Sequence, residues 1–444
     1  MPAPSADGVG RRRRLFADLS PLRESSDYRL LFAGQAVSNI GRQVTVVAVP
    51  FQVFELTHSS LAVGMVGLAS LGPIVVLSLV GGAIADAVDR RKLLLVIQVL
   101  MGLTSAALAL NAMQDGPALW PLYLLGPLAA GLAGIDLPTR NAMVPSLVSR
   151  EKYPAAAALN QIIWQLGLVA GPALAGVVIA QVSLSSAYWF DVATFGVAIL
   201  SVMGMRPHPP IADDEAEPGV PVAVPGWRRT SSPRALAGSI ADGLRYLRGR
   251  RLLVSTFVID IIAMVFGMPR ALFPALGTEV FGGGAATVGL LYAAPGAGAL
   301  IGAVFTGWVG SVRRQGLAVI IAVLGWGAAI AAFGLVAWLP GALVLLAVAG
   351  AADVISAVFR NTILQLSLPD NLRGRLSAVH IAVVSGGPYL GDAEAGAVAA
   401  LTSAQFSVVS GGVACVIGVI VLARLVPELS AYDAKTTPAV LPED

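Results

Sequence analysis

The chain alternates between long apolar runs and short polar connections along nearly its whole length. Each apolar run has enough residues to cross about 30 Å of hydrocarbon as a helix. A polar stretch near residues 206–250 divides these runs into two sets of six. The predicted spans lie near residues 30–54, 61–85, 93–113, 118–144, 156–180, 186–205, 252–275, 285–310, 316–337, 341–366, 376–400 and 404–426. The pattern therefore predicts an all-α integral membrane protein with twelve transmembrane helices in two six-helix bundles.

The polar stretches set the predicted domain organisation. The segments are a cytoplasmic N-terminal tail (1–27), a first bundle (28–205), a central cytoplasmic loop (206–251), a second bundle (252–427) and a cytoplasmic C-terminal tail (428–444). The start of the central loop is rich in Pro, Asp and Glu, which indicates a flexible linker. Residues 235–251 have apolar positions at helical spacing and several arginines. They predict either an amphipathic helix on the inner membrane surface or a soluble helix packed on the inner loops.

The distribution of basic residues predicts the topology. The short loops on one side of the predicted bundles contain no Lys or Arg; they are residues 55–60, 114–117, 181–185, 338–340 and 401–403. Cytoplasmic loops carry an excess of Lys and Arg, so both termini are expected in the cytoplasm. The four arginines at 11–14 are not followed by the apolar core of a secretory signal, and we interpret residues 1–27 as a retained tail.

Composition excludes several classes of protein. With 56% apolar and 12% charged residues, this is not a soluble globular chain. The net charge of +3 is explained by membrane topology, so no nucleic-acid partner is expected. One cysteine and three scattered histidines predict neither a disulfide nor a metal site, and we expect no cofactor. The chain contains neither a phosphate-binding loop nor a Gly-x-Ser-x-Gly nucleophile motif, which argues against ATP-driven transport and against an enzyme.

A charged motif separates the second and third predicted spans. It consists of Gly82, Asp86, Asp89, Arg90 and Arg91. This spacing resembles the loop motif between the second and third helices of the major facilitator superfamily. The chain departs from that motif at Ala87, where a basic residue is usual, and at Asp89, where glycine is usual. An aspartate before the basic pair also occurs in exporters of the enterobactin-exporter type, which this chain resembles over nearly its full length. The resemblance implies that Asp86 faces the start of the eleventh helix and closes the inner side.

The fifth predicted span carries a run of small residues with a proline. Gly167 and Gly171 form a face that lets a neighbouring helix approach, Pro172 is expected to kink the helix, and Gly176 follows. The run resembles the fifth-helix motif of antiporters in the superfamily, although Ala175 replaces one glycine. In that family the motif is typical of exporters.

The two halves of the sequence repeat one another. Asp136 and the pair Arg140–Asn141 lie toward the inner end of the fourth span, and Asp353 and Arg360–Asn361 lie toward the inner end of the tenth. The two Arg-Asn pairs are about 220 residues apart. Two such repeats place a substrate site between the halves, near the middle of the membrane.

Charged residues inside the spans are the candidates for substrate binding. Arg42, flanked by Asn39 and Gln43, lies in the first span, and Asp260 lies in the seventh. A charge at the bilayer centre costs at least about 2.5 kcal/mol, so each needs a partner or a cavity. The resemblance implies that helices 1, 4, 7 and 10 line a central cavity, with Asp353 also on its wall. Arg42 is then expected either to form a structural ion pair with Asp260 or to hold an anionic or catecholate-like substrate.

Carboxylates in the spans are the candidates for proton coupling. They are Asp260, Asp392, Glu394, Asp136 and Asp353. Asp392 and Glu394 lie close together in the eleventh span, where two acids share a proton more readily than both ionise. We interpret Asp191, in the sixth span, as structural.

Together these observations predict a secondary active transporter in a bacterial inner membrane. We expect export of a small organic molecule, a siderophore or related metabolite, by alternating access in exchange for protons. The alternatives are a multidrug or macrolide-type antibiotic efflux pump and a transport-inactive membrane receptor. The expected partners are the substrate, protons and the lipid bilayer, and the expected state is a monomer.

Overall fold

The computed structural model describes residues 18–206, 245–304, 312–367 and 373–433. Within these ranges the regular structure is entirely helical. Most of the helix predicted over residues 235–251 lies outside the described residues. The predicted limits of the domains stay predictions.

Twelve long helical elements follow one another in the described residues, as the hydrophobic pattern predicts. After the short α1 (Ser20–Glu24), the first half contains α2 (Ser26–Thr57), α3 (Ser60–Ala87), α4 (Arg90–Ala112), α5 (Trp120–Leu147), α6 (Tyr153–Gln181) and α7 (Leu184–Met203). The second half contains α9 (Arg251–Phe266) with its continuation to Val280, then α11 (Gly284–Val304), α12 (Gln315–Leu335), α13 (Leu339–Ser367), α14 (Arg373–Leu401) and α15 (Ala404–Leu425), followed by the short α16 (Pro427–Ala431).

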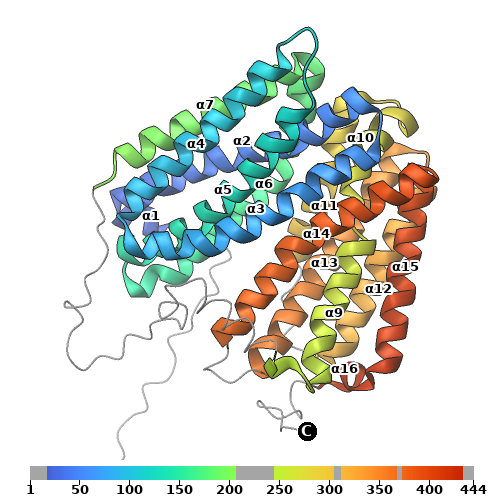
Figure 1. The fold of residues 1–444 in the computed structure, drawn as a ribbon. Helices are drawn as coiled ribbons and strands as arrows, with labels where there is room; N and C mark the ends of the chain where they lie inside the picture. Colours follow the sequence, from blue (N-terminus) through green and yellow to red (C-terminus); the bar gives the residue numbers. More distant parts are fainter. Residues whose placement is uncertain (1–17, 207–244, 305–311, 368–372, 434–444) are drawn as a thin grey trace, which may run out of the picture.

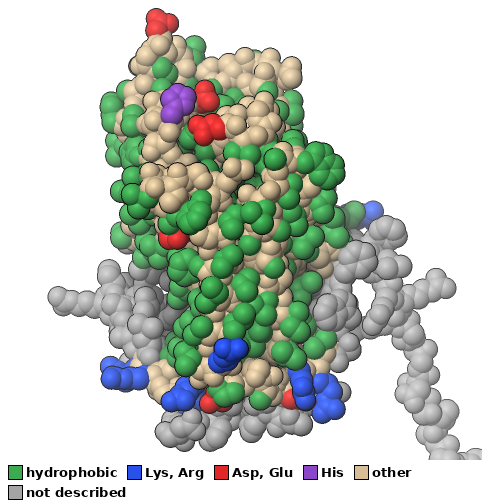
Figure 2. Space-filling model, turned by 90° about the vertical axis from the view of Figure 1, so that its right-hand side faces the viewer, with side chains coloured by type: hydrophobic (Ala, Val, Ile, Leu, Met, Phe, Trp, Pro, Cys, Tyr) green, Lys and Arg blue, Asp and Glu red, His purple; other side chains and the backbone are tan. Residues whose placement is uncertain are grey.

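The helices have the composition of a membrane protein. Ten of them in the described residues are long and apolar enough to cross a membrane. Helix α2 falls outside this set because it carries polar residues such as Asn39, Arg42 and Gln43 in its middle turns. On the face in Figure 2, a broad hydrophobic band covers the bundle, and most visible Lys and Arg side chains lie below it. This is the distribution of a protein whose band lies in lipid and whose basic end lies in water.

The seventh span is not one continuous helix. Helix α9 ends at Phe266, and the chain continues through short turns, η4 (Arg270–Leu272), α10 (Phe273–Ala275) and η5 (Leu276–Val280). The break occurs because Pro269 has no N–H and disfavours helical geometry in the residue before it. The indole of Trp326 donates a 2.9 Å hydrogen bond to the freed carbonyl of Gly267, which satisfies that polar group inside the membrane.

The two halves lie side by side and meet along two pairs of helices (Figure 1). Helix α3 packs against α14, and α6 packs against α11. A buried apolar cluster continues from one half to the other at the end where α2 turns into α3. It includes Val47, Phe51 and Val66 of the first half and Ala271 and Val288 of the second. The halves are therefore sealed at this end of the molecule.

Two glycines set the distance between α6 and α11. A Cβ atom on Gly176 would lie 2.9 Å from the carbonyl oxygen of Ala285, and one on Gly289 would lie 2.7 Å from the Cα of Gly176. Both neighbours are backbone atoms, which cannot move without separating the helices. The last glycine of the fifth-span motif is therefore a contact between the halves.

We expect the substitution Gly176→Ala to lower the free energy of unfolding by about 1–3 kcal/mol, because the added methyl group overpacks this contact. The measurement is thermal unfolding of the purified protein in detergent. Gly196→Ala in α7 is the matched control, because a Cβ there meets nothing within 4 Å. Equal unfolding temperatures for the two variants would contradict the assignment.

Candidate substrate and coupling site

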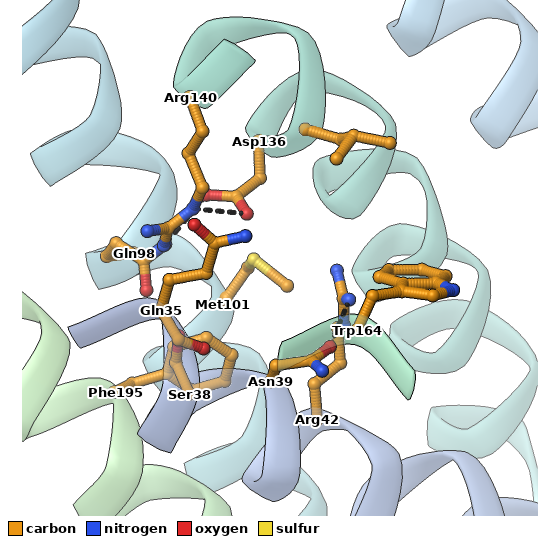
Figure 3. Close-up of a pocket in the computed structure, with 11 residues that line it drawn as sticks. Gln35, Ser38, Asn39, Arg42, Gln98, Met101, Asp136, Arg140, Trp164 and Phe195 are labelled. Atoms are coloured by element: carbon orange, nitrogen blue, oxygen red, sulfur yellow. Dashed lines mark hydrogen bonds and ion pairs between the residues drawn. The ribbon is translucent and has the colours of Figure 1, made fainter. Parts of the chain in front are cut away.

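Arg42 lies among polar side chains inside the first half of the molecule (Figure 3). Its Nη2 donates a 2.8 Å hydrogen bond to Oδ1 of Asn39, one helical turn earlier on α2. The guanidinium also lies over the ring of Trp164 of α6, 5.4 Å from the centroid. Asn39 in turn donates through Nδ2 to the carbonyl oxygen of Ile163, at 3.1 Å. The orientation of Arg42 is thus tied to the backbone of α6.

The fifth-span motif makes this arrangement possible. A Cβ on Gly167 would overlap the Asn39 amide, and one on Gly171 would overlap the Cβ of Gln43. Pro172 lies inside α6 directly after these contacts. The motif therefore brings α6 against the face of α2 that carries two of the predicted cavity residues.

Asp136 and Arg140 of α5 form the opposite wall of the pocket. Arg140 Nε donates to Asp136 Oδ2 at 2.8 Å, and Gln98 of α4 donates to Asp136 Oδ1 at 2.7 Å. The cavity between this wall and Arg42 has a free volume of about 20 Å³ for water-sized molecules. Its lining residues are Gln35, Ser38, Asn39, Arg42, Gln98, Met101, Asp136, Leu137, Arg140, Trp164 and Phe195. Two buried polar atoms in it, Arg140 Nη1 and Gln98 Oε1, have no protein partner among the described residues.

Arg42 differs from the other arginines of the membrane-spanning region. Arg140 pairs with Asp136, Arg270 pairs with Asp392, and Arg360 pairs with Asp260. Within the described residues Arg42 forms no salt bridge, and it contacts the neutral side chains of Asn39 and Trp164. A guanidinium with five N–H donors and one hydrogen bond retains capacity to bind an anionic group.

The second half contains a cluster of two acids and one arginine. Arg360 of α13 forms its closest ion pair with Asp260 of α9 and lies 3.7 Å from Asp353 on its own helix. The Asp260 side chain is 1% exposed, whereas that of Asp353 is 35% exposed. Asp260 is therefore engaged by Arg360 in this structure, and the alternative in which it pairs with Arg42 is not formed. Two acids share one arginine, so one of them can be neutral without leaving Arg360 unpaired.

Asp392 and Glu394 do not form a pair. Asp392 accepts hydrogen bonds from Arg270 Nη2 at 3.0 Å and from the backbone N–H of Ala271 at 3.1 Å. It therefore holds the chain directly after the break in the seventh span. Residues two positions apart on a helix point in different directions, and Glu394 is half-buried on another face of α14.

Asp191 of α7 has a larger role in positioning than its sequence context suggests. Its Oδ2 accepts 2.7 Å hydrogen bonds from the hydroxyls of Thr45 of α2 and Ser105 of α4. A Cβ atom at position 41, where α2 has a glycine, would lie 2.7 Å from Oδ1 of Asp191. The carboxylate therefore fixes α2 on either side of Arg42. The only sequence signal was an isolated acid in an apolar span, because its hydroxyl partners lie far away in the chain.

The basic pair of the loop motif binds helix ends in the first half. Asp89 caps α4 by accepting a 2.9 Å hydrogen bond from the N–H of Arg91. This cap is a structural reason for an aspartate at the position where the superfamily motif usually has glycine. Arg90 donates to the carbonyl of Ala142, and Arg91 donates to the last carbonyls of α7. The side chain of Asp86 lies outside the described residues, so the predicted contact of Asp86 with the eleventh helix stays a prediction.

Two half-bundles of six membrane-spanning helices, with charged clusters on the fourth and tenth spans, define a transporter of the major facilitator type. Solved structures agree with this fold. The nucleoside transporter NupG superposes with a TM-score of 0.68 at 12% identity, covering 92% of this chain and 100% of that one. A POT family transporter in complex with 5-aminolevulinic acid gives a TM-score of 0.66 at 13% identity, with 91% and 97% covered.

A family model described as "Transmembrane secretion effector" matches residues 16–443, so the chain belongs to this family of the major facilitator superfamily. It is similar to the enterobactin exporter EntS of Shigella boydii serotype 18, with 29% identity over 429 residues, 96% of this chain and 98% of the relative. The enterobactin exporter EntS of Escherichia coli O139:H28 matches with the same identity and coverage. The protein is thus a multi-pass membrane transporter and not an enzyme, as the sequence predicts.

We expect the substitution Asp260→Asn to lower the free energy of unfolding by about 1.5–3 kcal/mol, because it removes the closest charge-assisted hydrogen bond of Arg360 and leaves the more distant Asp353 as its carboxylate partner. Denaturant unfolding in detergent measures the change. Asp115→Asn, at an exposed position in the loop before α5, is the control and is expected to have little effect. The double variant Asp260→Asn with Arg360→Gln removes the weakly paired buried charge and is expected to recover part of the loss. Wild-type stability in Asp260→Asn alone would show that the ion pair does not stabilise the fold.

Proposed function

We propose that the protein exports a small anionic organic molecule, a siderophore or related metabolite, across a bacterial inner membrane by alternating access, in exchange for protons. The observation that carries the proposal is Arg42, a membrane arginine without a salt bridge among the described residues. A charge at this depth is costly unless it binds something, and a cationic site in a transporter is suited to an anionic substrate. The similarity to enterobactin exporters favours a siderophore.

Several features support Arg42 as the substrate residue. Its fork of N–H donors suits a carboxylate or two neighbouring phenolate oxygens, and Trp164 beside it suits a flat ring. Arg42 shares its pocket with Asp136 and Arg140, and all of the lining residues belong to the first half. A substrate that binds Arg42 and extends to the second half would contact both halves, and its binding free energy would then drive their relative movement.

The charges of the two halves support a division of labour. The charged residues that line the pocket in the first half, Arg42, Arg140 and Asp136, sum to one positive charge; Asp191 lies outside that lining, on the hydroxyls of Thr45 and Ser105. The cluster of Asp260, Asp353 and Arg360 in the second half sums to one negative charge. We assign substrate binding to the first cluster and proton binding to the second. Asp353 is the more exposed of the two acids that share Arg360 and so has the easier access to water. When Asp353 gains or loses a proton, the ion pair between Arg360 and Asp260 strengthens or weakens. Asp136, Asp392 and Glu394 remain further candidates for coupling.

The test is uptake of a labelled catecholate siderophore into inverted membrane vesicles, with and without a pH gradient. We expect gradient-driven accumulation in the wild type and a loss of at least about tenfold in Arg42→Gln, since a charge-assisted hydrogen bond contributes about 1.5–3 kcal/mol. Arg42→Lys keeps the charge without the fork and is expected to fall between them.

Variants of the acidic cluster separate binding from coupling. Asp353→Asn is expected to keep exchange of labelled for unlabelled substrate while losing accumulation driven by the gradient. Accumulation of a cationic dye without siderophore uptake would replace the proposal with drug efflux. A folded, inserted protein that moves neither compound would favour a receptor.

A further inference from the structure

A groove lies on the second half, where α9 and α15 run together at the basic end of the molecule. Its walls are apolar, with Val254 and Val258 of α9 facing Leu422 and Leu425 of α15. The groove has a volume of about 210 Å³, which is large enough for a segment of an acyl chain. Val254 and Leu425 are exposed, so the groove opens on the surface of the bundle and not into the core.

Arginines surround the end of this groove. Arg250 and Arg251 belong to its lining, and Arg251 is exposed. Arg250 stacks on the ring of Tyr246, 4.0 Å from the centroid, which fixes the plane of its guanidinium. Arg248 and Arg424 lie on the flanking segments, and one acid, Glu428, follows on α16. Among the described residues, the charge at this end of the groove is therefore positive.

The start of α9 adds hydrogen-bond donors at the same place. Among the described residues, no side chain caps the helix at Arg250. The first backbone N–H groups of a helix have no partner within the helix and favour an anion. The donors of α9 and the arginine side chains thus converge at one end of an apolar groove.

We propose that this groove binds an anionic phospholipid, with the phosphate at Arg250 and Arg251 and an acyl chain along Val254, Val258 and Leu422. The chemistry of the groove fits a molecule with one anionic end and one apolar end, and it lies where the hydrophobic band meets the basic end. Basic pockets between membrane helices select anionic lipid headgroups for this reason. A soluble anion would use the arginines and leave the apolar walls unexplained. The bound lipid would hold α15 against the first turns of the broken seventh span.

The test is native mass spectrometry of the full-length protein in detergent, after incubation with equal amounts of phosphatidylglycerol and phosphatidylcholine. We expect the wild type to retain at least about five times as much phosphatidylglycerol as phosphatidylcholine. The double variant Arg250→Gln with Arg251→Gln is expected to lose this preference. Val254→Trp fills the groove without changing charge and is expected to reduce phosphatidylglycerol retention several-fold.

The control is Arg313→Gln with Arg314→Gln, which removes two charges from the segment before α12, outside the groove lining. Loss of the preference in this control as well would show general attraction to the basic surface and overturn the site. Displacement of the lipid by millimolar inorganic phosphate, with Val254→Trp unchanged, would show a soluble-anion site instead. If the arginine variant fails to fold, retention in Val254→Trp decides the question.

Discussion

An arginine inside the membrane must be neutralised or must bind something, and this constraint organises the centre of the molecule. Arg140, Arg270 and Arg360 are each neutralised by a carboxylate from the same or a neighbouring helix. Arg42 instead donates a hydrogen bond to the neutral amide of Asn39 and lies over the ring of Trp164. Because Asn39 is bonded to the carbonyl of Ile163, the position of this cation depends on how closely α6 approaches α2. The packing of two helices thus determines the geometry of the proposed substrate site.

Helix α6 links that site to the contact between the halves. Gly167 allows the close approach to Asn39, and Gly176, more than two turns later, touches the backbone of α11 in the other half. The side of α6 that positions Arg42 and the side that meets the second half therefore belong to one continuous helix. A movement of the halves that displaces α6 also displaces the partners of Arg42. This coupling is the physical basis on which alternating access can change the affinity for a substrate.

The second half uses a different solution for its polar groups. The break after α9 exposes backbone groups, and they are satisfied by side chains from α12, α11 and α14: Trp326 bonds Gly267, Tyr292 bonds Arg270, and Asp392 bonds Ala271. Asp392 also packs against Gly67 of α3, so the break lies at the contact between the halves. The family model that matches residues 16–443 establishes the family and the transport class. The charges in these two clusters carry the proposals about substrate and protons.

The sequence alone determined the number and order of the spans, because a membrane helix needs a long apolar run and the bilayer fixes its length. It also pointed to the family, through the loop motif and the glycines of the fifth span, and it identified most of the charged residues within the spans as candidates. The sequence did not determine which carboxylate forms an ion pair with which arginine. Asp136 and Arg140 are four residues apart and their pairing follows from helical geometry, but Asp260 and Arg360 lie on different helices, and only packing brought them together. The same holds for Asp191, whose partners Thr45 and Ser105 come from two other helices. Tertiary structure decided these pairings because the identity of a polar residue's partner depends on how the helices are rotated about their axes, and apolar runs of similar composition leave that rotation open.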